Sequence, residues 1–404
     1  MLLIFQFVVF LWTQTFLLCS CSSLSLSNQL SNQLIRIGTR GSPLALVQAN
    51  NVKQLIETKY PSTRVEIKEI MTKGDAILDQ ALGSIGGKGL FVKELDVALL
   101  NNDVDICVHS MKDVPTTLVD GTILPCALPR ELTNDVFIST KYKSIQDVPD
   151  GATIGSASLR RKSQLLQMNP TWNVINFRGN VQTRLKKLKN GDVDGTMLAL
   201  AGLKRLNMVD LIKNSEVIPF KQMLPAVAQG AIGIQCRDHR CTHTHNSNTD
   251  SGSDSNADSK SGSDTTRDKL IYKMLKGLNH PHTMAAIGSE RKFLAALDGN
   301  CRTPIAAQVK YLSSNKKSSL NPTNSNNSNK SKSPVIDRML FSGLIAKPDG
   351  KDMIKIALDL PVSKAQSKDL SRFSAEIGTK VGSIIRNDIL GDELFQEYQE
   401  SFHM

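Results

Sequence analysis

The feature that most constrains the fold of this chain is the alternation of strand-like and helix-like segments between residues 34 and 240. Short apolar or alternating runs are typical of strands, and longer segments with helical spacing are typical of helices. Strands that are separated by helices of this length form parallel sheets. We therefore expect α/β domains, with strands at 34–39, 65–67, 104–108, 152–155, 173–177 and 195–199 and helices at 43–58, 91–99, 158–168 and 180–190. Ser42 offers an N-cap for the first of these helices, and Pro43 is its first helical position.

The remainder of the chain has a different pattern. A helix near 284–297 is followed by two or three strands and a final helix near 365–387, which predicts a smaller α+β domain. Residues 242–267 and 313–333 consist mostly of Ser, Asn, Asp, Thr and Lys. Because such segments bury too little apolar surface to offset the entropy of ordering, we expect two disordered surface insertions.

The amino terminus has the composition of a targeting segment. Residues 1–18 are almost wholly apolar, serines follow them, and no charged residue precedes Arg36. This pattern resembles the apolar core of a secretory signal. A membrane span is the alternative, but 18 residues that include Gln6 and Gln14 are marginal for crossing a bilayer. We expect residues 1–33 to be a leader and the rest of the chain to lie outside the membrane.

The net charge of +11 indicates an anionic partner, which could be a nucleic acid, a membrane surface or a small poly-acid. Aromatic residues make up only 5% of the chain, which argues against stacking of single-stranded bases. The seven cysteines have irregular spacing and give no disulfide framework. His239, Cys241, His243 and His245 lie close together but lack the usual zinc spacing, so we expect a polar loop and no metal site.

Arginine recurs at three predicted strand-to-helix turns. Arg40 precedes Ser42 at the first, Arg160 and Arg161 follow Ser158 at the second, and Arg178 is followed one turn on by Arg184 at the third. Helix N-termini attract anions, and adjacent guanidinium groups bind carboxylates in bidentate fashion. A solvated basic face would explain each turn alone. Together they predict a cleft that binds several carboxylates or phosphates.

Three further segments are candidates for chemistry. Lys112 and Asp113 directly follow a buried strand, where ligands of α/β sheets usually bind, although a solvated surface pair is the alternative. The glycine-rich run at 83–89 contains Lys88 but lacks the spacing of a phosphate-binding loop, so it is either a flap or a simple turn. Cys301 lies in a predicted tight turn after a helix, where a buried inert thiol is the usual outcome.

These segments, taken in order, resemble the porphobilinogen deaminases, and most closely their plant and algal members. The resemblance is close over about 34–240 and 268–310 and looser beyond. Its strongest pieces are Arg36–Arg40, Gly86–Leu95, His109–Pro115, Ser158–Arg161, Phe177–Arg184 and Leu224–Ala231. Ala157, Asn300 and the run His280-Pro281-His282 depart from the common family pattern.

The resemblance implies a transferase that deaminates four porphobilinogen molecules and condenses them head-to-tail into hydroxymethylbilane, releasing ammonia, in tetrapyrrole biosynthesis. It implies a dipyrromethane cofactor that the enzyme makes itself and holds by a thioether to Cys301. Asp113 would stabilise each azafulvene cation and manage its protons. The other residues that the resemblance implies at the cofactor are Lys112, Asp75, Ser110, Ser158, Arg160, Arg161, Arg184 and Gln229, and those at the substrate are Arg40, Ser42, Arg178, Lys88 and Phe91.

The implied fold has two α/β domains that resemble periplasmic binding proteins around a cleft, with a third, α+β domain carrying the cysteine. The first would span 34–130 with 229–241, the second 131–228 and the third 268–404, with hinges near 129–133 and 223–228 and a flap at 77–89. A monomer is expected. The leader suggests a plastid reached through the secretory route, with the cytoplasm or mitochondrion as alternatives.

Two other functions fit parts of the pattern. A carboxylate-binding module of the same architecture would need neither Asp113 nor Cys301, so these two residues favour the enzyme. A nucleic-acid-binding protein is suggested only by the charge, and its affinity would fall steeply with salt. We expect porphobilinogen as the partner and no nucleic acid.

Overall fold

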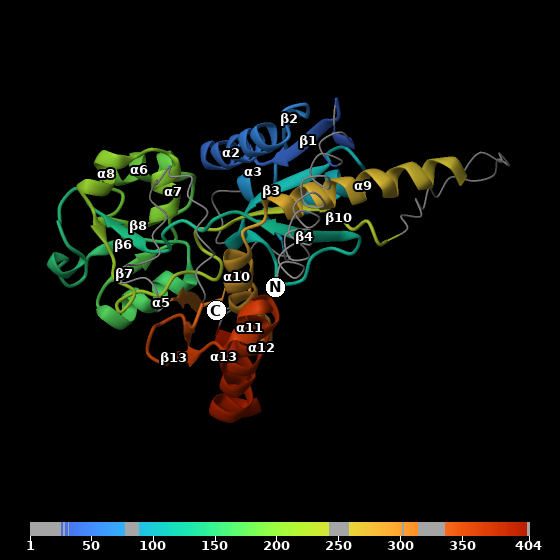
Figure 1. Cartoon of the computed structure of the whole chain (residues 1–404). Helices are drawn as coiled ribbons and strands as arrows, with labels where there is room; N and C mark the ends of the chain where they lie inside the picture. Colours follow the sequence, from blue (N-terminus) through green and yellow to red (C-terminus); the bar gives the residue numbers. More distant parts are fainter. Residues whose placement is uncertain are drawn as a thin grey trace, which may run out of the picture.

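The computed structural model describes residues 26, 29, 30, 32–76, 89–241, 258–300, 303–313 and 336–401. Two α/β units lie side by side, and the C-terminal part of the chain lies beneath and between them (Figure 1). Each unit is built on one five-stranded sheet, and a three-stranded sheet forms the C-terminal part. Lys88, Cys301, most of the expected flap, most of the leader and the greater part of both insertions lie outside the described residues.

The first sheet has the order β2-β1-β3-β10-β4. Its strands are β1 (Leu34–Thr39), β2 (Arg64–Glu69), β3 (Ile106–Ser110), β4 (Thr122–Ala127) and β10 (Ile232–Arg237). Along the chain, helix α2 (Pro43–Lys59) connects β1 to β2, and helices α3 (Lys73–Ala76) and α4 (Lys93–Leu100) lie between β2 and β3. The predicted cap of α2 is confirmed, because the Ser42 side chain accepts from the Ala45 amide and proline follows at the first helical position.

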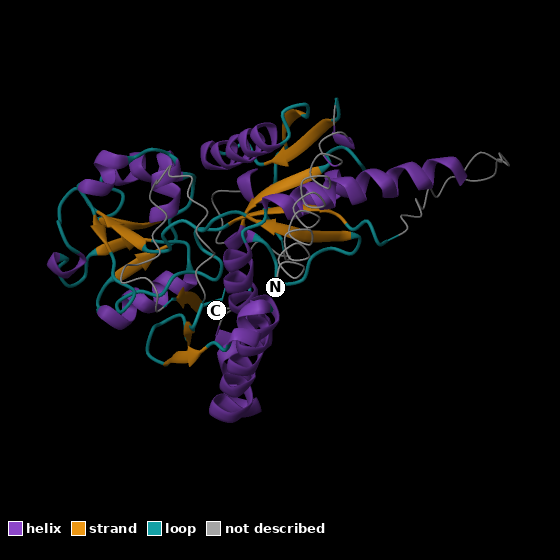
Figure 2. Cartoon of the chain, in the orientation of Figure 1, coloured by secondary structure: helices purple, strands orange, loops and turns teal. Residues whose placement is uncertain are grey.

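The second sheet has the order β7-β6-β8-β5-β9. Alternate residues of β5 face opposite sides, with Phe137 in one apolar cluster and Val136 and Ile138 in another. Helices therefore cover both faces (Figure 2). Its elements are β5 (Asp135–Ile138), β6 (Thr153–Gly155), α5 (Leu159–Met168), β7 (Asn173–Ile175), α6 (Val181–Lys189), β8 (Gly195–Ala199), α7 (Leu200–Arg205), α8 (Val209–Lys213) and β9 (Glu216–Val217).

The α/β class is confirmed, but the expectation of purely parallel sheets is wrong. β1 pairs in parallel with β2 and β3, whereas β10 pairs antiparallel with both β3 and β4. In the second sheet, β5 is likewise antiparallel to β8 and β9. Parallel neighbours need a crossover helix. β10 enters its sheet after the chain has passed through the second sheet, so no such crossover sets its direction.

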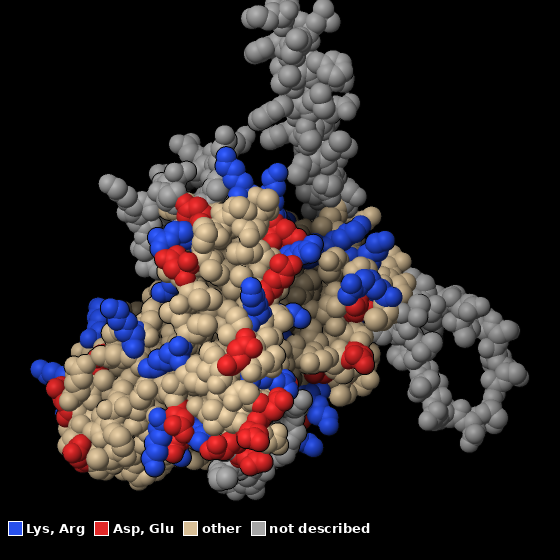
Figure 3. Space-filling model, turned by 90° about the horizontal axis from the view of Figure 1, so that it is seen from below, with Lys and Arg blue, Asp and Glu red and all other residues tan. Residues whose placement is uncertain are grey.

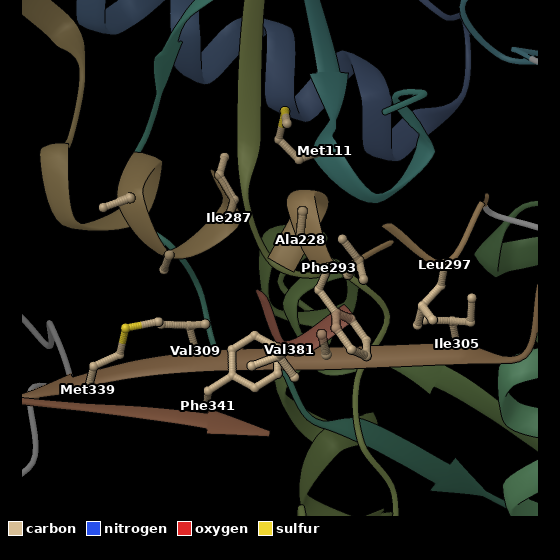
Figure 4. Close-up of a cluster of buried hydrophobic side chains, with 14 of the residues drawn as sticks. Met111, Ala228, Ile287, Phe293, Leu297, Ile305, Val309, Met339, Phe341 and Val381 are labelled. Atoms are coloured by element: carbon tan, nitrogen blue, oxygen red, sulfur yellow. The ribbon is translucent and has the colours of Figure 1, made fainter. Parts of the chain in front are cut away.

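The C-terminal part is an antiparallel meander with helices packed on one face. It consists of α10 (Pro281–Ala296), β11 (Ile305–Leu312), β12 (Arg338–Ala346), β13 (Met353–Pro361), α11 (Lys364–Lys368), α12 (Leu370–Ser383), a π-helical turn (Ile384–Leu390) and α13 (Gly391–Ser401). In its core, the rings of Phe293 and Phe341 pack edge to face, with their centroids 5.4 Å apart (Figure 4). Met111 belongs to the same cluster, so this core reaches the residue two positions before Asp113.

Helix α9 (Asp258–Leu278) corrects two expectations. Residues 258–267 are helical rather than part of a disordered insertion, and Ile271, Met274 and Leu275 are buried in the core of the first sheet rather than in the C-terminal part. Arg237 on β10 forms an ion pair with Asp268 at 2.8 Å. The polar composition at the start of α9 concealed a helix that tertiary packing stabilises.

The expected leader also overlaps the folded chain. Leu30 is fully buried with the core of the first sheet, and its carbonyl accepts a hydrogen bond from the Thr63 hydroxyl at 3.3 Å. Leu26 packs against the same cluster. The expected leader boundary at residue 33 therefore falls after two residues that pack against this core. Among the described residues, no helix is long and apolar enough to cross a membrane.

We expect Leu30→Ala to lower the free energy of unfolding by about 2–5 kcal/mol, because it leaves a cavity in a packed core. Leu55→Ala is the matched control, since Leu55 is 36% exposed on α2 and should change stability far less. Chemical denaturation of both variants checks this. Equal stability of the two variants would place Leu30 in the leader after all.

Candidate active site

A cleft of about 780 Å³ is lined by all three parts of the chain. The first sheet contributes the turns after β1 and β3, and the second contributes the starts of α5 and α6. Asn300 and Thr303, which flank Cys301 and Arg302 in the sequence, line it from the C-terminal part. On the face that Figure 3 shows, basic and acidic side chains are interspersed and form no single basic patch.

Asp113 reaches the cleft because of how β3 ends. β3 is buried along most of its length and passes at Ser110 into a single turn, Met111–Asp113. Met111 is 1% exposed and anchors the turn in the core below. Lys112 and Asp113 are thereby left at the cleft, with the Asp113 side chain 26% exposed. An Asp113 carboxylate oxygen lies 3.7 Å from Nη1 of Arg40.

Arg40 is held by acidic and aromatic neighbours. It donates to both carboxylate oxygens of Asp75, at 2.9 and 2.5 Å, and its guanidinium lies 4.2 Å from the ring centre of Phe91. Burial acts to lower the pKa of Arg40, but Asp75 and Asp113 raise it overall. Thr72 donates to Asp75 at 2.7 Å and fixes that carboxylate. Arg40 is thus a bridge between Asp75 and Asp113 as well as a candidate anion ligand.

The pair Arg160 and Arg161 has an acidic partner that the sequence did not reveal. Asp135, at the start of β5, is fully buried and forms ion pairs of 2.8 Å with Arg160 and 2.7 Å with Arg161. Burial acts to raise the pKa of Asp135, but the two arginines hold it well below its usual range. Gln229 also donates to Asp135, at 3.0 Å. Neither arginine is the free cation that the turn pattern suggested, because one buried acid is shared between them.

Lys112 and Arg184 are cations with no ion-pair partner among the described residues. Burial lowers the pKa of Lys112 to about 8 and that of Arg184 to about 10. The buried Nε of Arg184 lacks a hydrogen-bond partner within the described part of the chain. A buried charge without a partner is costly, and a bound anion would relieve that cost.

The remaining candidates also lie at the cleft, with two exceptions. Ser110 exchanges hydrogen bonds with Gln48 at 2.9 and 3.1 Å, and Arg178 donates to the carbonyl of Gly74 at 3.3 Å. Ser158 occupies the N-cap position of α5 without a side-chain cap bond. Ser42, Asp75, Phe91 and Gln229 line the cleft as well, whereas Lys88 and Cys301 lie outside the described residues.

Comparison with known proteins decides the family. The family model for "porphobilinogen deaminase, dipyromethane cofactor binding domain" matches residues 35–245. The chain belongs to the porphobilinogen deaminase family. The chloroplastic porphobilinogen deaminase of Oryza sativa subsp. japonica is 48% identical over 78% of this chain and 75% of that protein, and the one of Pisum sativum is 46% identical over 81% and 76%.

A solved periplasmic domain of Bordetella pertussis BvgS superposes with a TM-score of 0.34 at 12% identity, covering 61% of this chain and 86% of that domain. The strand order and pairing of the chain define its fold independently of this likeness.

The cleft suits the dipyrromethane group that the family model names. Lys112 and Arg184, which are half-buried, offer positive charge for carboxylates. The side-chain oxygen of Gln229 is buried without a hydrogen-bond donor among the described residues, and so can accept from an N–H. Unpaired cations and an unsatisfied acceptor in one cleft match a ligand that carries both carboxylates and pyrrole N–H groups.

The lowered pKa of Lys112 leads to a pH-dependent stability prediction for the chain without a bound ligand. The pKa of Lys112 is lowered on folding, so its charged form destabilises the fold and stability should rise as the pH increases above about 8. Lys112→Met should therefore raise Tm at pH 7 and lose that advantage near pH 10. Thermal melts of the two proteins across this range check it. A Tm difference that does not change with pH would contradict the assignment.

Proposed function

We propose that this chain deaminates porphobilinogen and condenses four molecules head-to-tail into hydroxymethylbilane, releasing one ammonia for each, in tetrapyrrole biosynthesis. The observation that carries the proposal is the Asp113 carboxylate at a cleft whose lining also includes Arg40, Lys112, Arg160, Arg161, Arg178 and Arg184. The cations suit the acetate and propionate groups of the substrate. The carboxylate suits the positive charge that develops when ammonia leaves.

Asp113 would act on that developing charge. Loss of ammonia leaves a cation delocalised over the pyrrole ring of the substrate, and a fixed anion beside it stabilises the transition state more than the neutral ground state. The carboxylate can also accept the pyrrole N–H and take up a proton. Arg40 lies 3.7 Å from it and would limit its rotation without sharing a close hydrogen bond.

Residues at the cleft would divide between two tasks. Lys112, Arg184 and Gln229 would hold the dipyrromethane, with Asp75, Ser110, Ser158, Arg160 and Arg161 supporting them. The dipyrromethane supplies, when bound, a free pyrrole position to which the first substrate is joined. We propose that Cys301 attaches it, since its neighbours Asn300 and Thr303 line the cleft. Arg40, Ser42, Lys88, Phe91 and Arg178 would bind substrate.

The proposed organisation follows the two sheets. We propose units at 34–130 with 229–241 and at 131–228, with residues 268–278 joining the first unit because α9 packs there. A monomer is proposed, and light scattering tests it. The chloroplastic relatives support a plastid destination. A secretory-type leader is our proposal, and a fluorescent fusion of residues 1–40 that stays in the cytosol would contradict it.

The activity itself is tested by supplying purified chain with porphobilinogen. We expect one ammonia released per porphobilinogen consumed and a linear tetrapyrrole of four rings as the product. A carboxylate-binding module without catalysis would bind porphobilinogen and release no ammonia. Binding without ammonia release, in protein that carries a two-pyrrole adduct, would contradict the proposed function.

A further inference from the structure

Helix α10 makes an unusual contact with the loop that follows Asp113. Arg291, in the second half of this helix, donates to three successive backbone carbonyls: Val114 at 2.8 Å, Pro115 at 2.5 Å and Thr116 at 3.4 Å. The first of these residues is adjacent to Asp113. One side chain of the C-terminal part therefore holds the backbone of the loop that leaves the candidate catalytic turn.

Within the described part of the chain, Arg291 is not part of an ion pair. No described carboxylate forms an ion pair with it, and burial lowers its pKa to about 10, which still leaves it charged at neutral pH. Its planar group carries five N–H donors in a fixed arrangement, so it can bind several carbonyls at once. The hydrogen bonds to the loop carbonyls offset the free-energy cost of desolvating this guanidinium group.

The C-terminal end of α10 leads directly into the segment Leu297–Asn300, which precedes Cys301 in the sequence. The Gly299 amide donates to the Leu294 carbonyl at 2.9 Å, and Arg386 forms an ion pair with Asp298 at 2.9 Å. A side chain at Gly299 would come within about 2.6 Å of Ile305, so this turn fits tightly. The chain between Arg291 and Asn300 therefore consists of the end of α10 and one tightly packed turn.

Glu290, the neighbour of Arg291, binds the same helix to both segments that connect the two five-stranded sheets, one at Arg130 and the other at Ala228. Its fully buried carboxylate accepts from Arg130 at 2.6 and 2.9 Å, from the Ala228 amide at 2.7 Å and from the Val309 amide at 2.8 Å. Helix α10 is consequently anchored at the residue directly before Arg291. A rigid support is what a positioning residue requires.

We propose that Arg291 is a positioning residue that sets the distance between Asp113 and the segment Asp298–Asn300 that follows α10. This inference rests on the proposed function, which gives those two places their roles. Arg291 touches no reacting atom in this scheme. It acts by holding the loop 114–116 against α10, so that the carboxylate of Asp113 stays in register with a chain growing from the turn.

The test compares Arg291→Gln and Arg291→Lys with Lys292→Gln, which changes an exposed residue on the same helix. We expect Arg291→Gln to keep the two-pyrrole adduct and a KM within about 2-fold of the parent. Its kcat should fall about 10-fold or more, because small displacements of catalytic groups cost rate. The kcat of Arg291→Lys should lie between those of the parent and Arg291→Gln, and the kcat of Lys292→Gln should equal that of the parent. Amide hydrogen exchange over residues 111–117 should accelerate most in Arg291→Gln, less in Arg291→Lys and not at all in Lys292→Gln.

A folded Arg291→Gln protein with unchanged kcat per adduct, or with unchanged exchange over 111–117, overturns the proposal. A purely structural role would lower Tm without changing kcat per adduct. If the glutamine variant does not fold, the lysine variant decides by the same two measurements. If the parent chain shows no turnover, the proposed function fails, while the exchange experiment still decides whether Arg291 holds the loop.

Discussion

Asp113→Asn should lower the turnover number at least about 100-fold, the lower end for losing one acid/base group. The amide keeps the shape of the side chain but removes the negative charge that opposes the substrate cation. Asp113→Glu keeps the charge and displaces it by one methylene, so it should retain more activity than the asparagine variant. Steady-state rates, normalised to adduct content by intact mass, give the order of the three proteins.

The control for this comparison is Asp120→Asn, which neutralises an exposed carboxylate further along the same loop. It should leave turnover unchanged. Stability should alter little in Asp113→Asn, because Asp113 is partly exposed and its nearest cation is 3.7 Å away. An asparagine variant that equals or exceeds the glutamate variant, with the adduct intact, would show that charge stabilisation is the wrong role for Asp113.

Cys301→Ser should abolish both the adduct and the turnover. A serine hydroxyl is a far weaker nucleophile than a thiol, so we expect no thioether and no replacement for it. The parent protein should exceed its sequence mass by two pyrrole units, and Cys301→Ser should match its sequence mass. Activity should then fall to the level of a blank without enzyme.

Cys241→Ser is the matched control, because Cys241 is an exposed free thiol while Cys107, Cys126 and Cys236 are buried. This control should keep the adduct and full turnover. An adduct that persists in Cys301→Ser, or a parent protein that is active without one, would refute attachment through Cys301.

Local signals predicted the early elements of the fold well. The N-cap Ser42, followed by proline, fixed the start of α2, and alternating apolar residues fixed β2. The antiparallel strands β5 and β10 were not predictable in this way. Their direction depends on partners far along the chain, such as Ile234 on β10 opposite Val108 on β3. Helix α9 was missed because its apolar residues begin only after a long polar stretch.

The sequence predicted which residues line the candidate site but not how their charges pair. Arg160 and Arg161 line the cleft as expected, yet Asp135 binds both of them. Nothing in the sequence marks an acid some 25 positions away as their partner. Conversely, Lys112 was expected at the cofactor, but its lowered pKa, which burial causes against the opposing effect of Asp113, was not predictable. Pairings of this kind depend on tertiary distances that spacing does not encode.

The order of strands in the first sheet also bears on how the protein is made. β10 lies between β3 and β4, although β4 is synthesised some hundred residues earlier. Until the ribosome has released Arg237, β4 has no strand to pair with. The second sheet uses only strands between Asp135 and Val217, so it can close while the first is still incomplete. The sheet that carries Asp113 is therefore the later of the two to be completed during translation, and β4 is the strand that a nascent-chain chaperone would need to shield.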